Sequence, residues 1–431
     1  MKGISTFSAV VMFIFVLLAL FGLLIFATFT ANSRDVIGTV EIWGAVDETV
    51  FDTVLTEVRD TREDFRDVSY TEISEDELVP KLVEAIASGR GPDLVLFPSD
   101  RLVRDDEKLA TISYDVMSKR GFQDAFVEAG EVFLRESGIL ALPFSIDPTV
   151  MYWNRTLFSN AGIAHPPRHW DELAKIAPSL TERLPNGSIS VSAVALGLWD
   201  NVAHAKEVFV SLVRQLGLPI VIVTPDGYRT DLIAVTSGVA APGVSAVRFL
   251  TDFADPVKPT YSWNRSQKNS RDAFLAGTVA MYFGPASELL TLRDANPNLN
   301  FDVAQLPQSR GAGKEVAARV TGVAIPRGSK NPAGALQVAL QLTSPNTALR
   351  VAELLTLPPT RRDVALDASR NAFLEVFQAS ALRSFSFLDI NPPETDALFS
   401  RMFGDISSGR ATLTEAVSAA NSDLRELLRV Q

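Results

Sequence analysis

The side chains of this sequence that could bind a small polar molecule lie directly after predicted strands. Trp43 ends a predicted strand at residues 39–43, and Asp47 follows in the same loop. An indole face suits the C–H face of a sugar ring, but Trp43 is equally consistent with a core residue whose N–H finds a partner. Asp47 can accept hydrogen bonds from hydroxyl groups, although capping the next helix is the favoured interpretation.

Asp100 and Arg101 follow a second predicted strand, at residues 93–97. A carboxylate beside a guanidinium can bind neighbouring hydroxyl groups through charge-assisted hydrogen bonds, and the alternative is a solvated surface pair. Ligands of open α/β sheets sit beyond the carboxyl ends of strands, where these residues lie. The histidines lack metal-ligand spacing, and no sequence motif fixes two carboxylates at catalytic distance. We therefore expect no metal, no cofactor and no catalytic residue.

The elements that must position these side chains alternate between strands and helices. The order β-α-β-α-β is legible in the first 100 residues, and Ser74 with Glu77 predicts a capping box at a helix start. This alternation implies parallel strands with crossover helices, an α/β fold. Further strands are predicted at 150–153, 280–283 and 321–325, and most of 345–428 is predicted to be helical.

Composition limits the number of domains and the kinds of partner. A single hydrophobic core stops growing beyond about 250 to 300 residues, so 431 residues predict two domains. With 40 Lys and Arg against 51 Asp and Glu, the net charge is -11, which disfavours nucleic acid as a partner. Cysteine is absent, which excludes disulfides and acylation of an N-terminal cysteine. Any membrane attachment must come from the polypeptide.

Residues 7–29 contain no charge, and residues 10–26 are nearly all aliphatic or aromatic. At 1.5 Å per residue this stretch can cross about 30 Å of hydrocarbon, so we expect a transmembrane helix. A cleaved signal peptide is disfavoured because Phe29 occupies a position that wants a small residue. Lys2 places the N-terminus in the cytoplasm, which predicts a single-pass protein of the cell membrane with its bulk outside.

Five segments, in this order, resemble the bacterial extracellular solute-binding proteins of ABC transporters, specifically family 1, which is similar to maltose-binding protein. They contain the sequences AIASGRGPDLV, LPFSID running into MYWNRTLF and WDEL, AFLAGTVAM, GVAIP with SKNP, and SGRATLTEA. Each segment alone is weak, and the order of all five is specific. They lie at residues 85–95, 142–173, 273–281, 322–332 and 408–416.

The resemblance implies a two-lobed periplasmic-binding-protein type II fold with interleaved lobes and hinge crossovers. Residues 1–37 would be the membrane anchor and a short linker. Lobe one would comprise residues 38–146 and 304–343, and lobe two residues 147–303 and 344–431. The chain would cross between the lobes near 146–148, near 301–307 and near Ser344.

The resemblance also implies ligand contacts. Asp100 and Arg101 match a ligand-contacting Asp-Arg pair, and Asp147 lies at the first crossover, where the family places an acidic contact. The alternative for Asp147 is a turn residue before a proline. Tyr282 and Gly284 belong to a loop that presents a stacking tryptophan in the family.

The position of that tryptophan falls near Ala286 in this chain, which is a departure from the family pattern. Trp199, Tyr261 and Trp263 are candidates to compensate for it. Each of the three is as consistent with packing as with stacking on a ligand.

The leading hypothesis is an extracytoplasmic protein, not an enzyme, that captures a small polar solute, with a carbohydrate favoured, and delivers it to the permease subunits of an ABC transporter. Its lobes would close on the solute by a hinge motion, which shifts an open-closed equilibrium. A membrane-tethered sensor or adaptor is one alternative. An extracellular glycan hydrolase is a weaker one, since paired carboxylates are not fixed by any motif.

Overall fold

The computed structural model of the chain describes residues 37–234, 241–311, 315–364 and 372–430. The predicted transmembrane helix at 7–29 lies outside these residues. Within the described ranges, no helix combines the length and the apolar character needed to cross a membrane.

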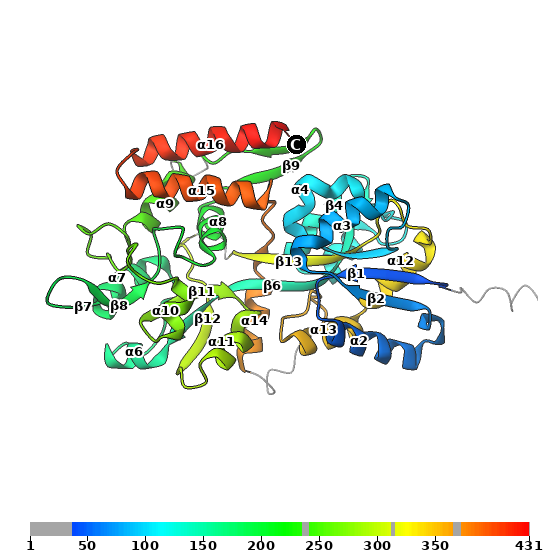
Figure 1. Ribbon diagram of the computed structural model, residues 1–431, viewed down its shortest axis with the longest axis horizontal. Coiled ribbons are helices and arrows are strands. Elements are labelled where there is room, and N and C mark those ends of the chain that lie inside the picture. Colours follow the sequence, from blue (N-terminus) through cyan, green and yellow to red (C-terminus); the bar gives the residue numbers. More distant parts are fainter. Residues whose placement is uncertain (1–36, 235–240, 312–314, 365–371, 431) are drawn as a thin grey trace, which may run out of the picture.

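Lobe one is the part of the molecule built on three parallel strands, to the right in Figure 1. β1 pairs with β2 on one side and with β3 on the other. The side chains of β3 are all buried, which matches its apolar sequence. These strands are β1 (Val40–Gly44), β2 (Val68–Glu72) and β3 (Leu94–Pro98), with helices α2 (Glu48–Thr61), α3 (Glu75–Ala87), α4 (Leu102–Asp105), α5 (Lys119–Ala125) and α12 (Pro332–Leu342). Short 3-10 turns follow, η2 (Ser99–Arg101), η3 (Asp106–Lys108) and η4 (Glu128–Phe133), with the hairpin β4 (Leu134–Arg135) and β5 (Gly138–Ile139).

Lobe two is the part built on β8, β11 and β12, to the left in Figure 1. Its strands are β7 (Glu182–Arg183), β8 (Ile189–Val194), β11 (Val279–Pro285) and β12 (Phe301–Gln305). Its helices are α6 (Arg155–Asn160), α7 (Trp170–Leu180), α8 (Ala205–Gln215), α10 (Ser270–Leu275), α11 (Glu288–Ala295) and α14 (Ala372–Ala381). A helical layer packs on this lobe, formed by α9 (Pro242–Thr251), α15 (Pro392–Ser407), α16 (Leu413–Val430) and the hairpin β9 (Val221–Thr224) with β10 (Gly227–Thr230).

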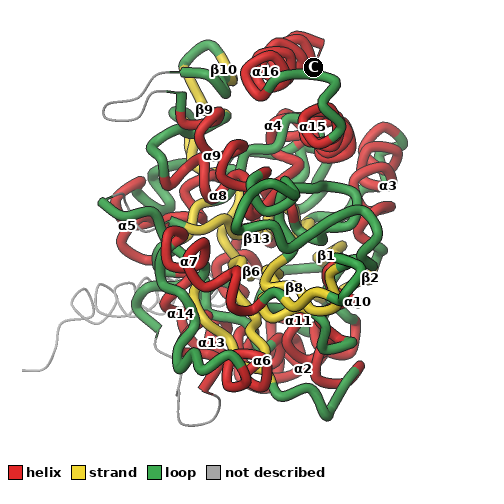
Figure 2. The backbone as a smooth tube through the Cα atoms, turned by 90° about the vertical axis from the view of Figure 1, so that its left-hand side faces the viewer, coloured by secondary structure: helices red, strands yellow, loops and turns green. Residues whose placement is uncertain are grey.

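The strand β6 (Ala141–Asn154) joins the two lobes in one sheet. Its residues 141–148 pair with β13 (Val316–Ala324), which in turn pairs with β3 of lobe one. Its residues 149–154 pair with β11 and β12 of lobe two. The partners therefore change between Pro148 and Thr149. Figure 2 shows β6 and β13 at the centre of the molecule with helices around them.

The chain crosses between the lobes again after α13 (Pro345–Leu355). Arg350 of α13 forms an ion pair with Glu57 of α2 at 2.9 Å, and Thr360 donates a hydrogen bond to the Pro143 carbonyl at 3.0 Å. α14 then packs against β6 and β12, and β14 (Ser384–Phe385) pairs with the start of β13. The segment from β14 to α15 runs between the lobes (Figure 1).

Local sequence signals identify the elements better than their caps. β1 begins at Val40, one residue later than the start of the strand predicted at 39–43, and α3 begins at Glu75 as the Ser74 signal predicts. The capping box itself is wrong, because the Ser74 side chain donates to the Glu77 carboxylate at 3.1 Å and caps no backbone N–H. Most of 345–428 is helical as predicted, apart from β14 and the connecting segments.

The helix α11 provides a matched test of the core of lobe two. Leu292 is fully buried, whereas Leu290, two residues before it, is 47% exposed. We expect Leu292→Ala to lower the free energy of unfolding by about 2 to 5 kcal/mol, because it removes buried methyl groups and leaves a cavity. Leu290→Ala should change it by less than about 0.5 kcal/mol. Guanidinium titration monitored by tryptophan fluorescence would measure both, and equal effects would contradict this core.

Candidate functional site

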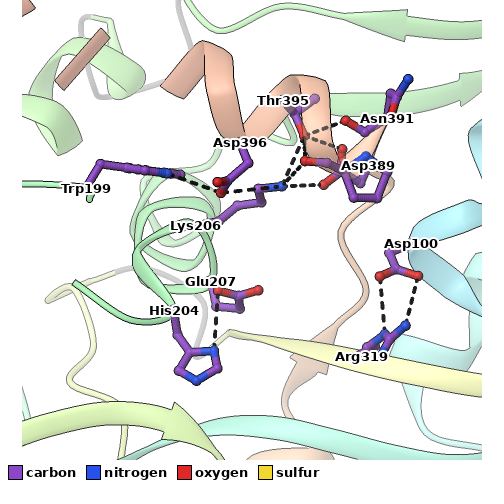
Figure 3. Close-up of polar contacts among 11 residues, drawn as sticks. Asp100, Trp199, His204, Lys206, Glu207, Arg319, Asp389, Asn391, Thr395 and Asp396 are labelled. Atoms are coloured by element: carbon purple, nitrogen blue, oxygen red, sulfur yellow. Dashed lines mark hydrogen bonds and ion pairs between the residues drawn. The ribbon is translucent and has the colours of Figure 1, made fainter. Parts of the chain in front are cut away.

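A cavity of about 160 Å³ lies between the lobes. Polar and charged side chains of both lobes reach it. Figure 3 shows Asp100 and Arg319 on one side and Lys206, Glu207 and Asp389 on the other. Lobe one contributes Ser99, Asp100 and residues 317–319 of β13. The other wall consists of Lys206, Glu207 and Val210 of α8 with Ser386, Phe387, Asp389 and Pro392 of the β14–α15 segment. A molecule bound here would contact both lobes at once.

The lobe-one wall is organised by Arg319, a charged residue within β13. Its guanidinium forms ion pairs with Asp100 at 3.2 Å and with Glu75 at 2.5 Å. Burial would lower the pKa of Arg319, but the charges of Asp100 and Glu75 outweigh burial and raise it. The η2 turn directly after β3 places Asp100 here, at the carboxyl end of a parallel strand. The wall therefore presents a carboxylate and a guanidinium held in fixed positions.

The opposite wall is organised by Lys206 in the first turn of α8. Its ammonium donates to Asp389 at 2.9 Å, to the Pro392 carbonyl at 2.9 Å and to Thr395 at 3.1 Å. Burial raises the pKa of Asp389, although Lys206 and Thr395 act in the opposite direction. An ammonium has three N–H donors, so these contacts use all of them. Lys206 thus fastens α8 to the segment that crosses between the lobes.

A second set of polar side chains lies near the point where β6 changes partners. Asp147 accepts a hydrogen bond from the Ser287 amide at 3.1 Å, and burial raises the pKa of this carboxyl. His204 contacts Glu288 at 3.2 Å, and the Tyr282 hydroxyl donates to the same carboxylate at 2.6 Å. His204 and Arg319 are both close enough to act electrostatically on Asp147.

The charge of His204 depends on the neighbouring carboxylates. Burial would lower the pKa of His204, but the hydrogen bond to Glu288 and the charges of Glu207 and Asp147 outweigh burial and raise it. The imidazolium thus contributes stability that is fully present below the ordinary pKa of 6.5 and is lost as the pH rises through the raised pKa. His204 is also the residue before α8 and has a left-handed backbone, with φ of 55°.

The structure places the predicted residues Asp100 and Asp147 at the junction of the lobes. Asp100 lines the cavity. Arg101 is partly exposed and acts electrostatically on Glu75. Asp47 is exposed and caps α2 by accepting from the amides of Thr49 and Val50, as the favoured interpretation stated.

The predicted aromatic residues mostly serve the core. Trp43 is partly buried and donates its N–H to Glu41 at 2.7 Å. Trp199 is 8% exposed, packs against Phe399 and Phe403 and donates to Asp396. Trp263, which donates to Asn201, and Tyr282, which stacks on Tyr152 and Phe274, are fully or almost fully buried. Tyr261 is partly buried. Tyr282 and the buried Gly284 lie within β11 and not in a loop after it.

Sequence reasoning missed Arg319, Lys206, Glu207 and Asp389, which together form most of the polar lining. Arg319 could have been identified from the sequence, because it is the single charged residue in an otherwise apolar run at 316–320. Lys206 and Glu207 lie at the start of a helix, and charged residues at that position are usually exposed to solvent. Their sequence therefore gave no sign of a role in the cavity. In the described part of the chain, no group of three or more His, Cys, Asp and Glu side chains is arranged to hold a metal ion.

The family pattern described as "Bacterial extracellular solute-binding protein" matches residues 60–375. The chain belongs to this family. A curated relative of this solute-binding protein, from Brucella abortus (strain 2308), is named only as a binding protein and is 24% identical over 238 residues. The matched region covers 54% of this chain and 53% of that relative, so the chain spans about half the length of the curated relatives it matches.

Solved structures share the fold of this solute-binding protein. An ABC transporter solute-binding protein from Thermotoga lettingae, bound with α-D-tagatose, is 19% identical with a TM-score of 0.66, over 91% of this chain and 100% of the other. The cyclic α-maltosyl-1,6-maltose binding protein from Arthrobacter globiformis is 16% identical with a TM-score of 0.71, over 91% and 99%. A Mycobacterium tuberculosis protein in complex with glycerophosphocholine is 17% identical with a TM-score of 0.69, over 91% and 99%.

The contact between Glu288 and His204 can be tested by measuring the pKa of His204. Because burial disfavours the imidazolium, Glu288→Gln should lower the pKa of His204 below its wild-type value. NMR titration of the imidazole resonances would measure this change. Glu84→Gln, the same chemical change at an exposed position of α3, should leave the His204 titration unchanged. A His204 midpoint that stays the same in Glu288→Gln would contradict the described site.

Proposed function

We propose that this solute-binding protein captures a small polyhydroxylated solute, a carbohydrate, between its lobes and delivers it to the permease subunits of an ABC transporter without altering it. The observation that carries the proposal is the interlobe cavity lined by charged and hydroxyl side chains of both lobes. Membership of the family and the sugars named for several proteins of the same fold support it.

The proposed ligand contacts are the polar groups on the two walls. Carboxylates and guanidinium groups held in ion pairs, such as Asp100 with Arg319, can bind the hydroxyl groups of a sugar by charge-assisted hydrogen bonds. Asp147, Arg101 and Glu207 would add contacts from the edges of the site. Pockets for drug-sized ligands measure about 300 to 1,000 Å³, so a cavity of about 160 Å³ favours a short solute in this conformation.

We propose that hydrogen bonding, rather than stacking on tryptophan, dominates recognition. Trp199 and Trp263 already donate their N–H groups within lobe two and are mostly buried. Trp43 remains a candidate platform, since it is partly exposed. Phe387 lines the cavity and offers an aromatic face there.

The lobes are proposed to move about β6 and the other crossings. We place the first boundary at residues 146–148, since β6 changes partners there. The third boundary, predicted at Ser344, is better placed after residue 364, because Arg350 and Thr360 contact lobe one. Ligand contact with both lobes then stabilises the closed form by its differential affinity.

We also propose that residues 1–37 tether the protein to the membrane, with the two lobes outside the cell. The support is the uncharged stretch at residues 7–29 and the extracellular character of the family. A tether would keep the binding lobes close to the permease.

Calorimetry on the full chain tests the proposal, with a panel of neutral sugars that includes tagatose, mannobiose and maltotetraose. We expect at least one sugar to bind. Asp147→Asn should weaken its binding about 10- to 100-fold, the cost of losing a hydrogen bond to a charged group. Asp52→Asn, the same change at an exposed position of α2, should leave binding unchanged. An absence of heat for the whole panel, or equal affinities of the two variants, would refute this function.

A further inference from the structure

A tyrosine of lobe two is inserted into an ion pair of lobe one. The Tyr228 hydroxyl, on β10, donates a hydrogen bond to Asp106 at 2.6 Å and accepts one from Arg135 at 2.5 Å. Asp106 begins η3 and Arg135 ends β4, and their side chains form an ion pair with each other at 3.1 Å. The three side chains thus connect the lobes through a closed triangle of polar contacts, separate from the cavity lining.

Further contacts hold the Tyr228 hairpin in lobe two and Arg135 in lobe one. On lobe two, Asp231 forms an ion pair with Arg425 of α16 at 2.9 Å, and the Leu232 amide donates to Asn421 of the same helix at 2.7 Å. On lobe one, Arg135 also donates to the carbonyls of Val132 and Leu134. Figure 1 shows the β9–β10 hairpin extending from lobe two toward α4, and Figure 2 shows it beside α16. A separation of the lobes at this side must therefore break the contacts of Tyr228.

The triangle is partly shielded from water, so its contacts are expected to stabilise more than those of a fully exposed ion pair. The Arg135 and Asp106 side chains are 13% and 27% exposed. Burial raises the pKa of Tyr228, so its hydroxyl keeps the proton that it donates to Asp106. A hydrogen bond to a charged group contributes more than one between neutral groups.

We propose that Tyr228 is a positioning residue for solute binding, which holds lobe two against lobe one and raises the fraction of molecules whose lobes are together. This proposal rests on the hinge motion of the proposed function. A ligand that needs both walls binds only the molecules whose lobes are together, so its apparent affinity scales with their fraction. Tyr228 would thus tune affinity without touching the ligand.

The absence of native cysteine allows a direct measurement of the distance between the lobes. Spin labels on Glu84→Cys of α3 and Ser418→Cys of α16, both exposed, would report it by double electron-electron resonance in the ligand-free full chain. We expect Tyr228→Phe, which removes a single oxygen, to raise the ratio of long to short distances about tenfold. Asp106→Asn should change the ratio in the same direction.

Tyr261→Phe is the matched control, because the Tyr261 hydroxyl contacts Asn264 within lobe two. It should leave the distance distribution unchanged, and all variants should retain the parent's far-ultraviolet circular dichroism spectrum, which shows that they are folded. A distribution that is identical in the parent and in Tyr228→Phe would overturn the proposal. The readout uses no sugar, so failure of sugar binding with a shifted distribution would count against the carbohydrate function alone.

Discussion

The two-lobed arrangement depends on the backbone hydrogen bonding of β6. This strand has 14 residues and pairs with β13 along its first part and with β11 and β12 along its second. A buried backbone amide or carbonyl must find a partner, so the strand cannot leave either half of the sheet without losing these contacts. The change of partner between Pro148 and Thr149 creates two bodies that share one strand, and Asp147 lies directly beside that change.

The charged groups between the lobes follow from the same arrangement. Burying a charge is costly unless it is paired, and here each described cation of the cavity wall has carboxylate partners. Arg319 is held by Asp100 and Glu75, and Lys206 is held by Asp389. These pairs fix the charged groups of each wall within the structure. In the proposed function, such pre-positioned groups would reduce the ordering cost of binding a solute.

Local patterns in the sequence predict much of the lobe-one sheet and of the C-terminal helices, because apolar runs and helical spacing report burial directly. The location of Asp100 after a parallel strand was also predictable, since sheet topology places such residues at one edge. The burial of Trp199 and Trp263 was not predictable, because a buried indole needs an N–H partner that lies far away in the sequence. Arg319 and Asp100 are more than 200 residues apart, and only the tertiary fold brings them together.

We propose that the two lobes, which share β6, close around a solute. Small-angle X-ray scattering of the full chain, recorded with and without a sugar that binds in calorimetry, measures this closure. We predict a smaller radius of gyration in the presence of the sugar, because hinge closure brings the lobes together. A radius of gyration that stays the same when the site is saturated would contradict it.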